Sequence, residues 1–194
     1  MVKNVDVVVI GAGAAGLMCA IEAGKRGRNV LVLDHADKLA KKIRISGGGR
    51  CNFTNLFTAP DAFLSANLHF CISALIQYSQ FDFIELLETH KIDYHEKKRG
   101  QLFCNDSAQN IIDMLKTMCD RHGVTIRMQR PITSLDALSP GFAVGTDDVL
   151  YHSESLVIAS GGLSIPKIGA TGIGYEIARK FGLNILTPRP GLVP

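Results

Sequence analysis

The residues best suited to chemistry in this 194-residue chain are glycines near its start. Gly11, Gly13 and Gly16 form a Gly-x-Gly-x-x-Gly pattern directly after the β-branched run Val5–Ile10 and directly before Ala-rich helical sequence. In that order, the first glycine permits a sharp turn, the second leaves room for a pyrophosphate, and the third lets the helix pack closely on the strand. This order, with an anion-binding helix N-terminus, favours a dinucleotide site over an ordinary glycine-rich corner.

A candidate carboxylate follows the glycines by about twenty residues, the spacing of a dinucleotide fingerprint. The run Val30–Leu33 predicts a buried strand, and Asp34 ends it. A carboxylate there can accept hydrogen bonds from both hydroxyls of an adenosine ribose, and it repels a 2′-phosphate. A solvated aspartate at a strand end is the alternative, and the strand–helix–strand pattern favours the ribose role.

A second glycine-rich segment, residues 41–55, contains three successive glycines followed by Arg50, Asn52 and Thr54. Successive glycines leave backbone N–H groups bare and allow positive φ angles. Such a segment can hold a phosphate or lie against a flat ring system. The alternative is a flexible surface loop.

A parallel sheet must position these candidates. Strands are expected at 5–10, 30–33 and 155–159, with a first helix at about 13–26 and a last helix at about 175–181. Residues 60–122 are expected to be mainly helical, with a hairpin of 92–95 and 101–104 between helices. The remaining short strands, which predict an antiparallel meander, are 124–130, 132–135, 142–146 and 149–152. The predicted class is α/β, a Rossmann-like domain with a parallel central sheet, a small antiparallel β-meander and a helical insertion.

This organisation predicts one nucleotide-binding domain over residues 1–194. Its core is expected at 1–59 and 153–187, and its helical insertion at 60–123. The strand and β-meander are expected at 124–152.

Composition restricts the classes of partner. The formal net charge is only +3, and the basic residues are scattered apart from short runs at 41–44 and 97–99. We therefore expect no nucleic-acid and no membrane partner. The five cysteines are an odd number without Cys-x-x-Cys spacing, which argues against a disulfide framework and a metal site. Reduced thiols and the lack of an export signal predict a cytoplasmic protein.

Several of these segments together resemble a known family. Gly11–Gly16, the acidic strand end at Asp34, the meander and Val157–Gly162 resemble the FAD-binding domain of glutathione-reductase-type flavoproteins. The string Ile45–Asn55 is more specific and is similar to the signature loop of the BaiN/YhiN-type FAD-dependent oxidoreductases. Gly169–Tyr175 also resembles that family.

The resemblance implies bound FAD, with NAD(P)H as the reductant and an undefined small-molecule substrate. The flavin would carry the hydride or electron transfer, so no side chain is assigned as catalytic. The residues expected to contact FAD are Gly11, Gly13, Ala14, Ala15, Gly16, Asp34, Lys42, Ser46, Gly47, Gly48, Gly49, Arg50, Cys51, Asn52, Gly161 and Gly162.

Cys51 is the one side chain in this set with covalent chemistry of its own. Disulfide reductases carry a Cys-x-x-x-x-Cys pair in the equivalent loop, but here Leu56 stands five residues after Cys51. A dithiol mechanism is therefore not expected. A single reactive thiol beside Arg50 and a packing role both remain open.

The resemblance also bears on length, because members of this family are longer and continue into a middle domain after a region that resembles Pro190–Pro194. It implies that residues 188–194 begin a connection to a second domain. It also implies an N-terminal portion whose open apolar edge weakens stability and FAD affinity and permits self-association. A non-catalytic nucleotide-binding module and an inactive fragment are the alternatives to a flavoenzyme.

Overall fold

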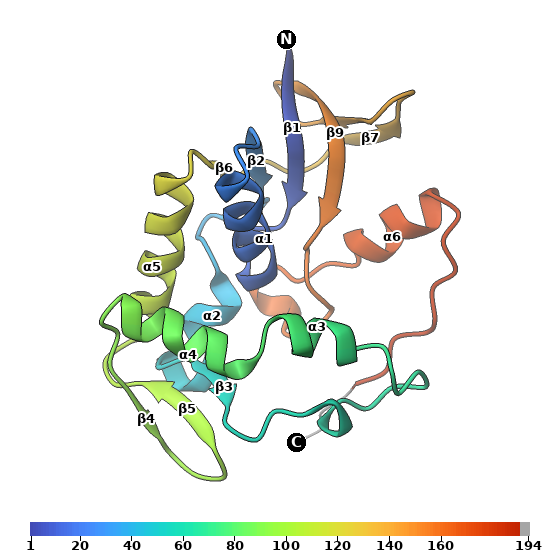
Figure 1. Cartoon of the computed structure of the whole chain (residues 1–194). Helices are drawn as coiled ribbons and strands as arrows, with labels where there is room; N and C mark the ends of the chain where they lie inside the picture. The colour runs from blue at the N-terminus through green and yellow to red at the C-terminus, as the bar shows by residue number, and fades with distance from the viewer. Residues whose placement is uncertain (191–194) are drawn as a thin grey trace. The chain divides into compact units, whose positions relative to one another are not determined.

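The computed structural model describes residues 1–190 (Figure 1). The chain consists of two compact units. Unit 1 consists of Met1–Ile43 and Ile112–Ile185, and unit 2 consists of Arg44–Ile111 and Leu186–Pro194. Most of the connection predicted at 188–194 lies outside the described residues. Within residues 1–190, no helix is long and apolar enough to cross a membrane.

In the described residues of unit 1, a six-stranded sheet has the order β6-β2-β1-β9-β8-β7 (Figure 1). The strands β6, β2, β1 and β9 are parallel neighbours, whereas β7, β8 and the first half of β9 are antiparallel. The predicted α/β class, with a parallel central sheet and a small meander, is confirmed. The strand bounds are β1 (Val2–Ile10), β2 (Val30–Leu33), β6 (Thr125–Arg127), β7 (Ser134–Ala137), β8 (Phe142–Gly145) and β9 (Leu150–Ile158).

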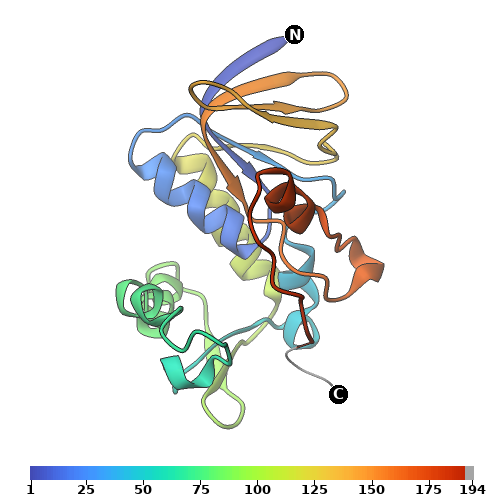
Figure 2. The same cartoon turned by 90° about the vertical axis from the view of Figure 1, so that its right-hand side faces the viewer.

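Helices cover both faces of the central strands, which is why those strands are continuously apolar. Figure 2 shows α1 (Ala14–Lys25) and α6 (Ile173–Lys180) on opposite sides of the sheet. All four residues of β2 are buried. Ile177 of α6 packs in one core cluster with Val8 of β1, while α1 buries Leu17 and Ile21. A further helix, α5 (Ala108–Arg121), crosses the boundary between the units in sequence.

The sequence-based expectation of two separate strands at 149–152 and 155–159 is wrong. The structure has one continuous strand, β9, which pairs with β1 from Leu150 to Ile158. His152 and Glu154 interrupt the apolar pattern within this strand. The backbone continues because its pairing with β1 does not depend on apolar side chains.

In the described residues of unit 2, a three-stranded sheet has the order β3-β5-β4. The strands β4 (Tyr94–Glu96) and β5 (Gln101–Cys104) form the predicted hairpin. β3 (Asn52–Asn55) pairs with β5 and was not predicted. The helices are α3 (Ile72–Gln77) and α4 (Gln80–Thr89), and η2 (Pro60–Ala62) is a short 3-10 turn.

Local capping explains where α4 begins. The Ser79 hydroxyl accepts a hydrogen bond from the Asp82 N–H, and the Asp82 carboxylate accepts one from the Ser79 N–H at 2.6 Å. This reciprocal capping box satisfies two donors at the start of the helix. The helix therefore begins at Gln80.

Candidate functional site

The corner between β1 and α1 gives each of its three glycines a different environment. Gly11 has a φ of +114°, and a Cβ there would lie 2.4 Å from the Ala159 carbonyl oxygen. A Cβ on Gly16 would lie 1.9 Å from the Gly11 carbonyl oxygen. A Cβ on Gly13 would meet no described atom within 4 Å. The fold therefore requires Gly11 and Gly16, whereas Gly13 leaves open space at the helix N-terminus.

A cavity of about 250 Å³ lies at this corner, beside the residues that follow β1, β2 and β9. Gly13 is the N-cap of α1, and no described side chain caps its first turn. The N–H groups of that turn and the helix dipole favour an anion. The predicted site residues that line this cavity are Gly11, Gly13, Ala14, Ala15, Asp34, Lys42 and Gly161.

Asp34 is held in place by two backbone N–H groups. Its Oδ2 accepts a hydrogen bond from the Ala12 N–H at 2.7 Å, and its Oδ1 accepts one from the Ala36 N–H at 2.8 Å. Its side chain keeps 16% of its surface exposed. Each carboxylate oxygen has capacity for another donor. The carboxylate is thus fixed at the cavity and can still accept bonds from ribose hydroxyls, a role that stays a prediction.

Two side chains at this cavity form hydrogen bonds with the segment that follows β9. Lys42 Nζ donates to the Gly162 carbonyl oxygen at 2.9 Å and to Ser164 Oγ at 3.1 Å. His35 Nε2 donates to the Gly169 carbonyl oxygen at 2.9 Å. Lys42 is therefore occupied in fixing the segment after β9. His35 was not among the predicted site residues, although its place directly after Asp34 could have indicated it.

A second cavity, of about 310 Å³, shares Gly11, Asp34 and His35 with the first. Ile132 and Ile173 add apolar surface to it. Apolar walls with a few polar groups suit a flat ring such as a nucleobase. Arg130, Ile132, Ile173 and Glu176 line this cavity but were not among the predicted site residues, because no short motif marks them.

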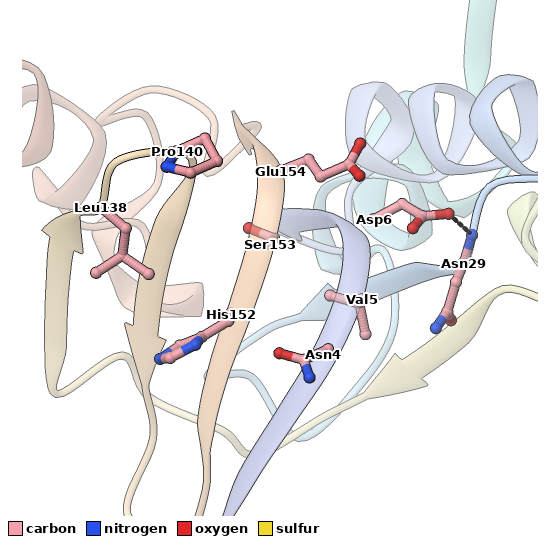
Figure 3. A pocket seen from close by; sticks show the side chains of 9 residues that line it. All are labelled: Asn4, Val5, Asp6, Asn29, Leu138, Pro140, His152, Ser153 and Glu154. Carbon is pink, nitrogen blue, oxygen red and sulfur yellow. Dashed lines mark hydrogen bonds between the residues drawn. The ribbon is translucent and has the colours of Figure 1, made fainter.

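A third cavity, of about 320 Å³, lies towards the amino-terminal halves of β1 and β9 (Figure 3). Here the Asp6 carboxylate accepts a hydrogen bond from the Asn29 N–H at 2.7 Å. None of the predicted site residues lines this cavity. Asp6 thus accepts one backbone N–H and Asp34 accepts two, in two different cavities of the same unit.

The predicted residues Ser46–Asn52 belong to unit 2. They form a 3-10 turn, η1 (Ser46–Gly49), and the start of β3, following a short helix, α2 (Lys41–Ile45). The three glycines of η1 have φ angles of 58°, 66° and 87°. The Cys51 N–H donates to the Ser46 carbonyl oxygen at 3.0 Å, which closes the turn. The segment is therefore a hydrogen-bonded turn, and its contact with a cofactor stays a prediction.

Cys51 and Cys104 are buried thiols of unit 2. Burial raises the pKa of Cys51, and a hydrogen bond with the Ser46 side chain offsets part of this rise. Burial, together with the nearby Cys51 sulfur, raises the pKa of Cys104 to about 11. Both groups are therefore neutral thiols at neutral pH. This environment supports the packing role of Cys51 over the reactive one.

Alkylation of the native protein tests this assignment. At pH 7.5, Cys104 should carry about one hundredth of the thiolate of a thiol at the ordinary pKa of 9.0. We expect iodoacetamide to label the half-exposed Cys71 at least about tenfold faster than Cys51 or Cys104, as measured by peptide mass spectrometry. Labelling of Cys51 as fast as Cys71 would restore the hypothesis of a reactive Cys51.

Relatives by sequence support a Rossmann domain, and the chain matches only part of the length of each. Residues 5–193 match the family described as HI0933-like protein Rossmann domain. The chain is 50% identical over 192 residues to the ribosomal RNA dihydrouridine synthase of Escherichia coli (strain K12), which covers 99% of this chain and 48% of that protein. It is 26% identical to the 3-dehydro-bile acid delta(4,6)-reductase of Clostridium scindens, over 95% of this chain and 46% of that protein. The chain spans about half the length of these curated relatives.

A solved structure supports the fold. The 3-ketosteroid-delta4-(5alpha)-dehydrogenase from Rhodococcus jostii RHA1 superposes with a TM-score of 0.63 at 18% identity, over 83% of this chain and 46% of that chain. At this identity the likeness concerns the fold alone. The sheet order, the glycine corner and the family match agree, and the chain belongs to the HI0933-like Rossmann-domain family.

Proposed function

We propose that this chain is the FAD-binding half of a flavoprotein oxidoreductase of the BaiN/YhiN type. The observation that carries the proposal is the corner of β1 and α1. There, Gly13 leaves open space at an uncapped helix N-terminus, within the described residues, and Asp34 is fixed at the end of β2. This arrangement fits a pyrophosphate at the start of α1 and a ribose at Asp34. The second cavity fits the adenine ring.

One observation favours FAD over a nicotinamide dinucleotide as the ligand of this half: the string Ser46–Asn52 resembles the loop of FAD-dependent enzymes. The two relatives described above have names that describe reductive chemistry, which a flavin can supply. NAD(P)H is then the proposed source of reducing equivalents. When bound, the flavin supplies a hydride, and the residues of this chain bind and orient it.

The activities in the names of the two relatives concern the same kind of double bond. Dihydrouridine differs from uridine by two hydrogens across the C5–C6 double bond, which is conjugated to a carbonyl. A delta(4,6)-reductase of a 3-dehydro compound also acts on double bonds conjugated to a ketone. We therefore propose reduction of a carbonyl-conjugated carbon–carbon double bond. At 50% identity, uridine in ribosomal RNA is the best supported substrate of the whole protein.

Asp34→Asn tests the ribose contact. The variant keeps the shape of the side chain but loses its charge and one acceptor oxygen. Because hydrogen bonds to charged groups contribute about 1.5–3 kcal/mol, we expect FAD affinity to fall about tenfold or more. The readout is the rise in melting temperature of the full chain as FAD is added.

Asp6→Asn is the matched control, because Asp6 also accepts a backbone N–H but lies at the third cavity. It should cost less stability than Asp34→Asn, because the remaining amide oxygen can still accept the Asn29 N–H, and it should leave the FAD effect unchanged. NAD⁺ should stabilise the wild-type chain less than FAD does. Stabilisation by NAD⁺ and not by FAD would contradict the proposal and favour a nucleotide-binding module.

A further inference from the structure

The turn between β4 and β5 presents three successive cations. Lys97, Lys98 and Arg99 are all exposed. Within residues 1–190, none of the three makes an ion pair with a carboxylate. Exposed cations that make no ion pair with a carboxylate attract a polyanion. Lys97 Nζ also lies over the Phe103 ring, 5.2 Å from its centroid, so Lys98 and Arg99 are the two cations considered for phosphate contacts.

Hydrogen bonds hold this turn in one shape. The Asn55 side-chain amide donates to the Arg99 carbonyl oxygen at 2.9 Å, and the Leu56 N–H donates to the Gly100 carbonyl oxygen at 2.8 Å. The Gly100 N–H donates to Glu96 Oε1 at 2.9 Å, so the nearest carboxylate is engaged with the backbone. A turn that is ordered before binding loses less entropy when it meets a partner.

An exposed aromatic ring lies against the same turn. Phe57 keeps 73% of its surface exposed, and a Cβ on Gly100 would lie 2.7 Å from its ring carbon Cδ2. The Phe57 N–H donates to the Asn55 side-chain oxygen at 2.8 Å, which ties the ring's backbone to the residue that holds the turn. The ring is therefore anchored on one side and open to solvent on the other.

Cations beside an exposed aromatic ring are the elements with which proteins bind unpaired nucleotides. The cations contact phosphates, and the ring stacks on a base. We propose that the β4–β5 turn with Phe57 is an RNA-contacting surface, with Lys98 and Arg99 on phosphates and Phe57 against a base. An acidic protein would use the cations but has no base to place on Phe57. This inference rests on the proposed function, because it assigns a contact for the proposed ribosomal RNA substrate.

Charge neutralisation tests the phosphate contacts. The probe is a fluorescein-labelled RNA stem-loop with uridines in its loop, followed by anisotropy at several salt concentrations with the full chain. Lys98→Gln combined with Arg99→Gln should raise the Kd about tenfold and lower the slope of log K against log salt by about 1.4. At the Arg99 φ of 53°, glutamine is no more strained than arginine.

Lys25→Gln combined with Arg26→Gln is the matched control. It removes the same net charge from exposed side chains that pair with Glu22 in unit 1. Its Kd should change by less than about twofold. An equal loss in both double variants shows a response to net charge alone, and it overturns the assignment of the surface.

Phe57→Leu tests the stacking contact, since leucine preserves apolar contact with Gly100 but has no aromatic face. RNA binding should weaken at least about fivefold, because base–aromatic stacking is a strong contact. Phe81→Leu is the control, as Phe81 is also exposed, at 60%, and lies outside the turn. Equal binding by Phe57→Leu and wild type overturns the base contact.

Two further measurements complete the test. If polyglutamate displaces the labelled RNA as effectively as unlabelled RNA does, the assignment is overturned in favour of an acidic protein partner.

The FAD-dependent rise in melting temperature is measured for every variant. RNA binding unchanged by the substitutions, with the FAD effect intact, overturns this inference alone. A wild-type chain that FAD does not stabilise overturns the proposed function.

Discussion

Gly16→Ala is expected to lower the free energy of unfolding by about 3 kcal/mol, the upper end of the typical cost of overpacking, because the added Cβ meets backbone. The new Cβ would lie 1.9 Å from the Gly11 carbonyl oxygen and 3.3 Å from the Ala159 Cβ. Neither neighbour is the end of a flexible side chain, so β1, α1 or both must shift. Alanine has the higher helix propensity by about 1 kcal/mol, so a loss of stability here comes from packing.

Thermal and urea unfolding of the full chain measure this effect. For a chain of this size, a loss of about 3 kcal/mol corresponds to a fall in melting temperature of roughly 6–12 °C. Gly13→Ala is the matched control, because it makes the same chemical change three residues earlier. A Gly16→Ala protein as stable as wild type would show that α1 does not pack on β1 as closely as the structure has it.

Gly13→Ala is expected to have the opposite pattern: little loss of stability and a large loss of FAD binding. Gly13 has φ −89° and ψ −172°, an extended conformation that alanine adopts freely. No described atom lies within 4 Å of the added Cβ, and replacing a glycine N-cap costs less than about 1 kcal/mol. The Cβ occupies the space that the pyrophosphate needs.

Displacing the pyrophosphate from the first turn of α1 removes charge-assisted hydrogen bonds, which contribute about 1.5–3 kcal/mol each. We expect the Kd for FAD to rise about a hundredfold (~2.7 kcal/mol). Quenching of flavin fluorescence on addition of protein measures it. Gly13→Ala protein that binds FAD as tightly as wild type would place the pyrophosphate elsewhere.

The glycine corner could be predicted from the sequence because its geometry is local. Gly11, Gly13 and Gly16 lie within six residues, and each restricts the backbone of its own neighbourhood. Asp34 was predicted for a related reason, since it ends an apolar run that is buried on both faces. The continuity of β9 could not be read this way, because pairing with β1 outweighs its polar residues.

The parts that sequence reasoning missed depend on residues distant along the chain. Ile132 and Ile173 complete the second cavity from two separate segments that no motif connects. Phe57 meets Gly100 only because β3 pairs with β5, and β3 was not predicted. The expectation of no nucleic-acid partner was drawn from a scattered charge distribution. The RNA inference departs from it, because the sequence alone does not show an aromatic ring beside the cationic turn.

An equilibrium titration of the cofactor-free chain with FAD, followed by flavin fluorescence, tests whether the glycine corner binds this dinucleotide. We expect saturable binding of one FAD per chain, displaced by ADP and not by FMN, because the proposed contacts hold the adenosine and pyrophosphate. Gly13→Ala should weaken that binding and Asp6→Asn should not. Absence of saturable binding, or displacement by FMN and not by ADP, would contradict the account.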